Sequence, residues 1–498
     1  MGNQTTMELY TTLTLFISIV SFLFLHHFLK NSPKSKLPPG PKPWPIIGNI
    51  HLLGSKPHCS VANLSKIYGP VMSLKLGSIV TIVISSPKVA KEMFLKHDSA
   101  CSSRRVPDCF KIIGHEQVSM VWLPANHRWR NLRKISATQL FTNLRLDANQ
   151  GLRREKINDL IQFVKDSCGS GLAIDIGKAA FTTSLNLLSN TFFSVELASY
   201  DSSISHEFKE LVWRVLEVGA TPNISDFFPL IRTFDLQGTR RRGKYYLLKL
   251  RGIFEKIIDE RLSCQTSGKD DVLDTLLKLV KQNELSLHEV QHFLIDLFVA
   301  GTDTTSSVLE WAMTELLRNP EKMGKLQNEI NNAFGNDQSK SIQESDISKL
   351  PYLQGVVKET LRLHPPAPFL LPRKVEKDID LVGYHVPKNS TIWVNVWSMG
   401  RDPSNWSNPE VFMPERFLDS EIDVKSRHSE LIPFGAGRRI CPGLPLAYRM
   451  VHLMLANLVQ FFNWKVDRWS NPEEIDMEEK FGITLQKAKP LEVVPILR

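Results

Sequence analysis

One stretch of this 498-residue chain decides how it folds: Pro433-Phe434-Gly435-Ala436-Gly437-Arg438-Arg439-Ile440-Cys441-Pro442-Gly443. Two glycines, an aromatic residue and two arginines precede its single cysteine, and a proline and a glycine follow it. Glycine permits a tight turn that brings the backbone close to a planar ligand, with N–H groups directed at the sulfur. Arginine pairs well with carboxylates at the edge of such a ligand. The stretch therefore predicts a fixed thiolate beside a planar cofactor, and the alternative is a buried structural cysteine next to a basic turn.

The composition is that of an ordinary globular protein, since 42% of the residues are hydrophobic and 23% are charged. The net charge of +9 is spread along the chain, and its densest patch, residues 240–244, has no RNA-binding motif around it. Nucleic acid is therefore not an expected partner. The six cysteines are irregularly spaced and form no Cys-x-x-Cys pair, which disfavours a disulfide framework and structural zinc. A reducing compartment is the simplest interpretation.

The N-terminal region has the features of an uncleaved membrane anchor. Residues 9–25 carry no charge and, with the residues that follow, approach the ~20 residues that cross a bilayer. Lys30, Lys34 and Lys36 come next, which by the positive-inside rule retains the downstream chain in the cytosol. Lysines in place of small residues disfavour the alternative, a cleaved signal peptide. A proline-rich spacer follows. We expect an anchor over 1–29, a basic and proline-rich hinge over 30–45, and one large domain over 46–498.

Hydrophobic periodicity predicts long helices with minor sheets. β-Branched and apolar residues predict a hairpin over 71–84, a second over 381–396 that turns at 387–389, and a strand over 491–496. Because these segments flank the helices instead of alternating with them, the chain is expected to be mainly α with minor β-sheets. Apolar residues at helical spacing predict helices at about 127–141, 152–167, 204–219, 240–262, 287–318 and 444–460.

The stretch around Cys441 has the spacing Phe-x-x-Gly-x-Arg-x-Cys-x-Gly and resembles the haem-ligand loop of the cytochromes P-450 at every defined position. The resemblance implies the triangular, α-rich fold of that family, with haem b held between two long helices. It implies that Cys441 is the axial ligand of the haem iron and that Phe434 and Arg439 bind the haem. The proline-rich spacer resembles the hinge of microsomal members, so the large domain is expected to be a haem-thiolate catalytic domain.

Ala300-Gly301-Thr302-Asp303-Thr304-Thr305 lies within the long apolar pattern over 287–318 and contains weak helix formers. Such a cluster predicts a local widening, with hydroxyls that compete for backbone carbonyls. The alternative is a break between two helices. The segment resembles the family's oxygen groove, which implies that both residues are catalytic, with Thr304 as a hydrogen-bond partner of dioxygen and Asp303 as part of a proton relay.

Further arginines match positions that bind or support the haem in this family. Trp129 and Arg133 stand four residues apart on one predicted helical face, and the resemblance implies that both meet the haem propionates. Arg373 occupies a position where many members carry another propionate arginine. The alternative for each arginine is a surface position.

Glu359 and Arg362 lie three residues apart on one helical face, and Arg416 follows in a Pro-Glu-Arg-Phe sequence. Isolated surface pairs of this kind contribute ~0–1 kcal/mol. The three residues resemble the family's buried Glu-Arg-Arg triad, which implies a structural role in supporting the cysteine loop.

One motif points to a different chemistry. His288-Glu289-Val290-Gln291-His292 matches the zinc-protease pattern His-Glu-x-x-His, with two imidazoles at i and i+4 and a glutamate base. A zinc site needs a third ligand, and the metzincin continuation is absent. A zinc metalloprotease that uses His288, Glu289 and His292 is therefore the disfavoured alternative, and solvated histidines at a helix start are expected instead.

The resemblance narrows to a plant group of terpenoid hydroxylases that includes geraniol 8-hydroxylase and ferruginol synthase-like oxidases. It implies an NADPH- and O2-dependent monooxygenase that hydroxylates a lipophilic small molecule, most simply a monoterpenol such as geraniol, with a diterpenoid as the alternative. Electrons are expected from NADPH through a membrane-bound flavoprotein, cytochrome P-450 reductase, and the chain is expected in the endoplasmic reticulum membrane. Apolar candidates for the substrate pocket, for which core packing is the alternative, are Val118, Met120, Val299, Ala300, Ala367, Phe369, Leu370 and Ile483.

Overall fold

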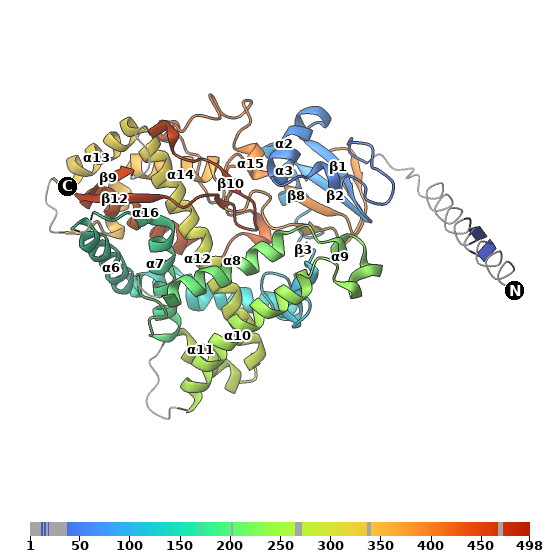
Figure 1. The fold of residues 1–498 in the computed structure, drawn as a ribbon, viewed down its shortest axis with the longest axis horizontal. Coiled ribbons are helices and arrows are strands. Elements are labelled where there is room, and N and C mark those ends of the chain that lie inside the picture. The colour runs from blue at the N-terminus through green and yellow to red at the C-terminus, as the bar shows by residue number, and fades with distance from the viewer. Residues whose placement is uncertain are drawn as a thin grey trace, which may run out of the picture.

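The computed structural model describes residues 37–498 except 170, 201–202, 264–270, 336–339 and 467–471, together with positions 11, 12, 14, 15 and 18. Helices dominate this part of the chain, as predicted (Figure 1). The α-helices are α2 Pro57–Tyr68, α3 Pro87–Lys96, α4 His127–Ile135, α5 Asn143–Ala148, α6 Gln150–Cys168, α7 Ile176–Phe193, α8 Ser203–Ala220, α9 Ile224–Phe227, α10 Thr239–Ser263, α11 Val272–Lys281, α12 Leu287–Arg318, α13 Pro320–Phe334, α14 Pro351–Leu363, α15 Val396–Met399 and α16 Leu444–Phe461.

The six predicted helical ranges are all helical in the structure, with α4 continued by a π-helical turn over Ser136–Leu140. The longest, α12, begins at a capping box in which Ser286 and Glu289 satisfy each other's backbone N–H groups. It then runs through Gly301 as one continuous α-helix, so the alternative of a break between two helices is wrong and the predicted local widening is not seen. The predicted competition for backbone carbonyls is confirmed, because the hydroxyls of Thr302, Thr304 and Thr305 donate to carbonyls four residues earlier.

Small sheets lie beside the helices. In Figure 1 the sheet that contains β1, β2 and β8 lies with α2 and α3 on one side of the molecule, and the long helices fill the other side. The strand order is β1-β2-β8-β5-β3 in the largest sheet and β4-β12-β9 in the second, with hairpins β6-β7 and β10-β11. The strands are β1 Val71–Leu76, β2 Ile79–Ile84, β3 Ser103–Arg104, β4 Ile174–Asp175, β5 Arg373–Lys374, β6 Ile379–Leu381, β7 Tyr384–Val386, β8 Thr391–Val394, β9 Phe462–Val466, β10 Glu479–Lys480, β11 Gln486–Lys487 and β12 Glu492–Leu497.

The first predicted hairpin is confirmed, because β1 and β2 pair antiparallel across Gly77. The second is wrong in its register. Its turn lies at Val382 and Gly383, both at positive φ, where β6 pairs with β7. The following strand, β8, leaves this hairpin and pairs with β2 and β5 in the largest sheet. Local alternation cannot distinguish these partners, since β2 lies about 300 residues away in sequence.

The mainly helical architecture with minor sheets agrees with the fold class inferred from the resemblance. The anchor predicted over 1–29 falls almost entirely outside the described residues. Within the described part, no helix is both long enough and apolar enough to cross a membrane.

Candidate active site

Cys441 lies between the short 3-10 turn Gly437–Arg439 and the start of α16. The Cys441 N–H donates to the Phe434 carbonyl at 3.0 Å, which closes the turn. Gly437 has φ +69°, and a Cβ at this position would collide with the Asp98 carboxylate, which accepts from the Arg438 N–H at 2.9 Å. Glycine is therefore required here for both the conformation and the close approach.

The sulfur of Cys441 lies in a largely apolar environment. Burial raises the pKa of the Cys441 thiol above its usual value, while the N–H groups of Gly443 and Leu444 and the charge of Arg133 oppose that rise. Backbone donors that stabilise negative charge on sulfur are what a thiolate metal ligand needs. The loop is therefore built to hold a thiolate once a metal binds it, because coordination deprotonates a thiol.

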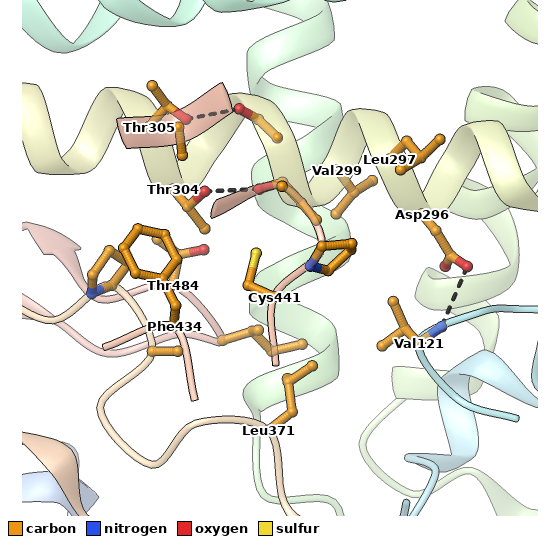
Figure 2. A pocket seen from close by; sticks show the side chains of 18 of the residues that line it. Val121, Asp296, Leu297, Val299, Thr304, Thr305, Leu371, Phe434, Cys441 and Thr484 are labelled. Carbon is orange, nitrogen blue, oxygen red and sulfur yellow. Dashed lines mark hydrogen bonds between the residues drawn. The ribbon is translucent and has the colours of Figure 1, made fainter. Parts of the chain in front are cut away.

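A cavity of about 340 Å³ opens onto Cys441. Figure 2 shows Cys441 and Phe434 on one side of this space and Thr304 and Val299 of α12 on the other. Residues of α16, among them Leu446 and Val451, also line it. The cavity therefore lies between α12 and the segment that leads into α16, as expected for a planar cofactor held between two long helices.

Arginines gather at one end of the cavity. Arg439 donates to the carbonyls of Ser102, Met120 and Leu123, and its guanidinium lies 4.5 Å from the centroid of the Trp129 ring. Burial, together with repulsion from Arg373 and Arg133, lowers the pKa of Arg439 to about 9. Arg373 donates to Asp98 at 2.8 Å and to the Ala436 carbonyl at 2.9 Å. The positive charges of Arg439 and Arg373 repel each other, so this end of the cavity favours binding of a further anionic group.

The arginine end also contains donors without acceptors. Trp129 Nε1 and Arg104 Nε are buried atoms that have no hydrogen-bond partner in the structure. Together with the Cys441 sulfur and the apolar walls, they fit an iron porphyrin, whose propionates the arginines and Trp129 would hold. The predicted binding residues Trp129, Arg133, Arg373, Arg439, Phe434 and Cys441 all line this one cavity.

Arg104 was missed by the sequence reasoning. It lines the cavity, and burial together with Arg373 and Arg439 lowers its pKa well below the usual value. In the sequence it is one of two adjacent arginines in a loop, a pattern that usually lies on the surface. Only the pairing of β3 with β5, which sets Arg104 opposite Arg373, carries it into the site.

The two predicted catalytic residues of α12 face different ways. Thr304 lines the cavity, and its hydroxyl donates to the Ala300 carbonyl at 2.7 Å. Asp303 is 1% exposed and does not line the cavity; its carboxylate accepts from the Gln486 side chain. Burial raises the pKa of Asp303 to about 6, against the hydrogen bonding of Thr484 and the charge of Lys209. A carboxyl group with this pKa can hold or release a proton near neutral pH.

Glu359, Arg362 and Arg416 meet in the interior. Arg362 donates to both Glu359 oxygens at 2.7 and 2.8 Å, and Arg416 Nε lies 3.0 Å from Glu359 Oε1. Glu359 and Arg362 are at most 1% exposed. Arg362 also donates to the carbonyls of Gly400, Pro409 and Val411, so the triad joins α14 to the segment that precedes the cysteine loop.

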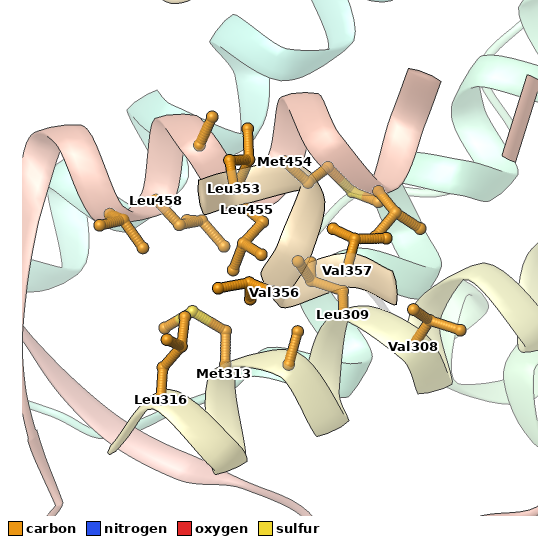
Figure 3. Packing of buried hydrophobic residues seen from close by; sticks show 14 of the residues in the cluster. Val308, Leu309, Met313, Leu316, Leu353, Val356, Val357, Met454, Leu455 and Leu458 are labelled. Carbon is orange, nitrogen blue, oxygen red and sulfur yellow. The ribbon is translucent and has the colours of Figure 1, made fainter. Parts of the chain in front are cut away.

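The triad helix α14 belongs to the main hydrophobic core. Figure 3 shows Val356 and Val357 of α14 packed between Leu309 and Met313 of α12 and Met454 and Leu455 of α16, and these buried residues belong to one cluster. Packing at this density fixes the two helices that line the cavity relative to each other.

Most of the predicted substrate residues line the cavity, namely Met120, Val299, Ala300, Ala367, Leu370 and Ile483. Val118 and Phe369 are not among the lining residues, which agrees with the alternative of core packing. Phe369 belongs to the hydrophobic cluster around β1, and its ring stacks on Trp393 at 4.8 Å. Val118 is buried directly after the 3-10 turn His115–Gln117. Its neighbour Ser119 is also buried, and the Ser119 hydroxyl donates to Asp296.

The His-Glu-x-x-His segment does not form a zinc site. Glu289 caps α12 and pairs with Arg128 at 3.1 Å. His292 is fully buried, not solvated as predicted, and its Nδ1 lies 2.6 Å from Nδ1 of His115. Among the described residues, the groups of side chains close enough to share a metal ion do not include this segment.

Comparisons with known proteins agree with this site. The family model "Cytochrome P-450" matches residues 38–493. A cytochrome P-450 monooxygenase designated 76AD131 from Lophophora williamsii is 55% identical over 97% of this chain and 99% of its own length. Geraniol 8-hydroxylase from Catharanthus roseus is 51% identical over 97% and 99%. Drimenol monooxygenase from Persicaria hydropiper is 49% identical over 96% and 95%.

Proposed function

The chain belongs to the cytochrome P-450 family and is a haem-dependent monooxygenase, and from this premise we propose that it hydroxylates a plant terpenoid, with geraniol as the model substrate. The carrying observation is the cavity, whose lining includes Cys441 and apolar side chains such as Val299, Leu370 and Ile483. A wall of this kind suits an isoprenoid chain. The names geraniol 8-hydroxylase and drimenol monooxygenase among the relatives support the same class.

The test of this function is an assay of membranes that contain the protein and a cytochrome P-450 reductase. With NADPH, we expect geraniol to give a monohydroxylated product that is absent without NADPH. An abietane diene in a parallel incubation distinguishes the diterpenoid alternative. Product from neither substrate would contradict the terpenoid proposal and leave the monooxygenase class intact.

The cofactor we propose is haem b, held by Cys441 and by the arginine end of the cavity. When bound, haem iron with a cysteine thiolate ligand activates dioxygen for insertion of one oxygen atom into a C–H bond. The chain's own residues position the substrate, exclude water and supply protons. We assign proton supply to Asp303, whose pKa of about 6 suits it, with Thr304 as the hydroxyl that faces the cavity.

We propose that the electron donor is an NADPH-dependent flavoprotein reductase that docks beside α4. This helix turns Trp129 and Leu132 inward, and Arg130 and Lys134 are exposed on its outer surface. Arg438 of the cysteine loop is also exposed, and the loop meets α4 where Arg439 lies over Trp129. Basic groups over the shortest route to Cys441 would attract an acidic partner.

Replacing Arg130 and Lys134 together with glutamate is expected to slow reduction by the reductase roughly tenfold or more at low salt, because rim charges act mainly on association. The salt dependence of the rate should weaken as well. Stopped-flow reduction measures both quantities, and Lys88→Glu with Lys91→Glu on the outer face of α3 is the matched control. Unchanged kinetics in the α4 variant would count against this docking surface.

We propose that the protein is a single-pass protein of the endoplasmic reticulum, with residues 1–29 as the anchor, 30–45 as the hinge and 46–498 as the cytosolic catalytic domain. Exposed apolar side chains support a membrane-facing surface near the hinge: Trp44, Ile46, Leu230, Phe234 and Leu236. The turn between β1 and β2 contacts both segments that carry these exposed side chains. The Gly77 N–H donates to the Ile47 carbonyl, and the Ser78 N–H donates to the Phe227 carbonyl.

The orientation predicts the absence of glycans. Asn63, Asn389 and Asn405 are exposed acceptors in Asn-x-Ser/Thr sequences, so they would be modified if the domain entered the lumen. We expect none of the three to carry a glycan after expression in eukaryotic cells. The mass shift on glycosidase treatment is measured in an Asn3→Gln variant, because Asn3-Gln4-Thr5 is an acceptor sequence on the other side of the proposed anchor. An acceptor sequence fused ahead of Met1 is the positive control, and glycan on any of the three asparagines would overturn the orientation.

A further inference from the structure

A buried polar cluster interrupts the apolar wall of the cavity. Asp296 of α12 is 4% exposed and accepts from the Ser119 hydroxyl at 2.8 and 2.9 Å. His115 Nε2 lies 3.1 Å from the same carboxylate, and the Val121 N–H donates to it at 3.4 Å. Both His115 and Asp296 line the cavity. Figure 2 shows Asp296 on α12 with its carboxylate directed at Val121.

The cluster provides a carboxylate acceptor whose position is fixed by buried donors. His115 Nδ1 lies 2.6 Å from Nδ1 of His292, and burial lowers the pKa of His292 to about 3, so His292 is neutral. Because a carboxylate only accepts hydrogen bonds, His115 Nε2 is the donor toward Asp296 and, together with the Ser119 hydroxyl, it fixes the position of the carboxylate.

The Asp296 carboxylate has acceptor capacity left. Three protein groups donate to it, namely the Ser119 hydroxyl, the His115 ring and the Val121 N–H, whereas a carboxylate offers about four acceptor positions. A ligand O–H is the neutral group that can complete this set. An ether or a hydrocarbon bound next to Asp296 has no O–H to donate, so the fourth acceptor position of the carboxylate stays without a hydrogen bond.

The cluster also lies at a fixed distance from Thr304, which lines the cavity near Cys441. Asp296 and Thr304 are eight residues apart on the same continuous helix, which corresponds to ~12 Å along its axis. An extended prenyl alcohol can reach between two such points. A ligand anchored at Asp296 would therefore present a carbon remote from its hydroxyl to the region of Thr304 and Cys441.

We propose that Asp296, held in place by Ser119 and His115, accepts a hydrogen bond from the hydroxyl of the substrate and so selects isoprenoid alcohols over the corresponding ethers and hydrocarbons. The inference rests on the terpenoid function proposed above. It adds to that function a recognised chemical group and an expected site of oxidation, the end of the chain opposite the hydroxyl.

The test is ligand binding, measured as the spectral shift of the haem-loaded protein on titration with geraniol and with geranyl methyl ether. We expect wild type to bind geraniol at least tenfold more tightly. In Asp296→Asn the amide offers an N–H that either oxygen can accept, so the two dissociation constants should agree within about threefold. Asp226→Asn is the matched control and should keep the wild-type ratio, because Asp226 is a carboxylate outside the cavity that accepts from the Asp108 N–H at 2.7 Å.

The outcomes separate the two proposals. Equal affinities of wild type for alcohol and ether overturn the assignment of Asp296 alone. Binding of neither ligand by wild type contradicts the terpenoid function and the inference with it. Should Asp296→Asn lose the thiolate spectrum of a folded protein, Asp296→Glu, which moves the acceptor by one methylene, serves in its place and should also reduce the ratio.

Discussion

Replacing Cys441 with alanine is expected to reduce monooxygenase activity below detection and to remove the carbon monoxide difference band that is characteristic of thiolate ligation. The sulfur lies on the cavity wall, and the N–H groups of Gly443 and Leu444 are placed to stabilise its negative charge. No other described cysteine lines this cavity, so none can substitute for Cys441. Electron donation from a thiolate is what favours cleavage of dioxygen at this class of site.

Cys59→Ala is the matched control for this experiment. Cys59 is a partly exposed thiol on α2, outside the cavity, and its removal should leave both the band and the activity unchanged. The two variants should be compared at equal haem content. A thiolate band that persists in Cys441→Ala would overturn the assignment of the ligand.

Glu359→Gln is expected to lower the free energy of unfolding by ~3–5 kcal/mol, because it leaves two arginines in the interior without their charge partner. Arg362 is 1% exposed and binds Glu359 through two hydrogen bonds, so the loss is not screened by solvent. Glu359 also accepts from the Met413 N–H at 2.7 Å, and this hydrogen bond connects α14 to the segment before the cysteine loop. Denaturant unfolding and haem content after purification measure the effect.

Glu415→Gln is the control because it removes a carboxylate from the 3-10 turn Pro414–Phe417, which carries Arg416 of the triad. Glu415 pairs with Lys322 and Lys325, and its side chain is 27% exposed, so we expect a change within about 1 kcal/mol. Activity per bound haem should be similar in both variants, since neither residue lines the cavity. Full stability of Glu359→Gln would contradict the structural role of the triad.

The predictions from sequence succeeded where the signal is local. Helices such as α12 and α16 follow from apolar residues at a spacing of about 3.6, and each residue's neighbours in a helix are three and four positions away. The hairpin over 71–84 turns at Gly77, which its own sequence specifies. The Cys441 turn is local as well, since its closing hydrogen bond spans only the residues from Phe434 to Cys441.

Errors arose where the partner is distant in sequence. β8 carries the alternation of a hairpin strand but pairs with β2. The His-Glu-x-x-His segment predicts solvated histidines, yet His292 is buried against His115. Each of these outcomes depends on which element packs alongside, and a single stretch of sequence does not contain that information.

By itself, the sequence determined the helical framework and the candidate residues for the cysteine ligand and for oxygen chemistry, because short-range geometry and side-chain chemistry specify them. Only the tertiary structure brought Arg104 beside Arg373 and set Ser119 and His115 against Asp296, residues more than 170 positions apart. The physical reason is that the shape and polarity of a cavity come from the packing of several elements at once. The sequence of one loop therefore predicts the chemistry at Cys441. The residues that select the substrate can be identified only in the folded chain, where several elements together form the cavity wall.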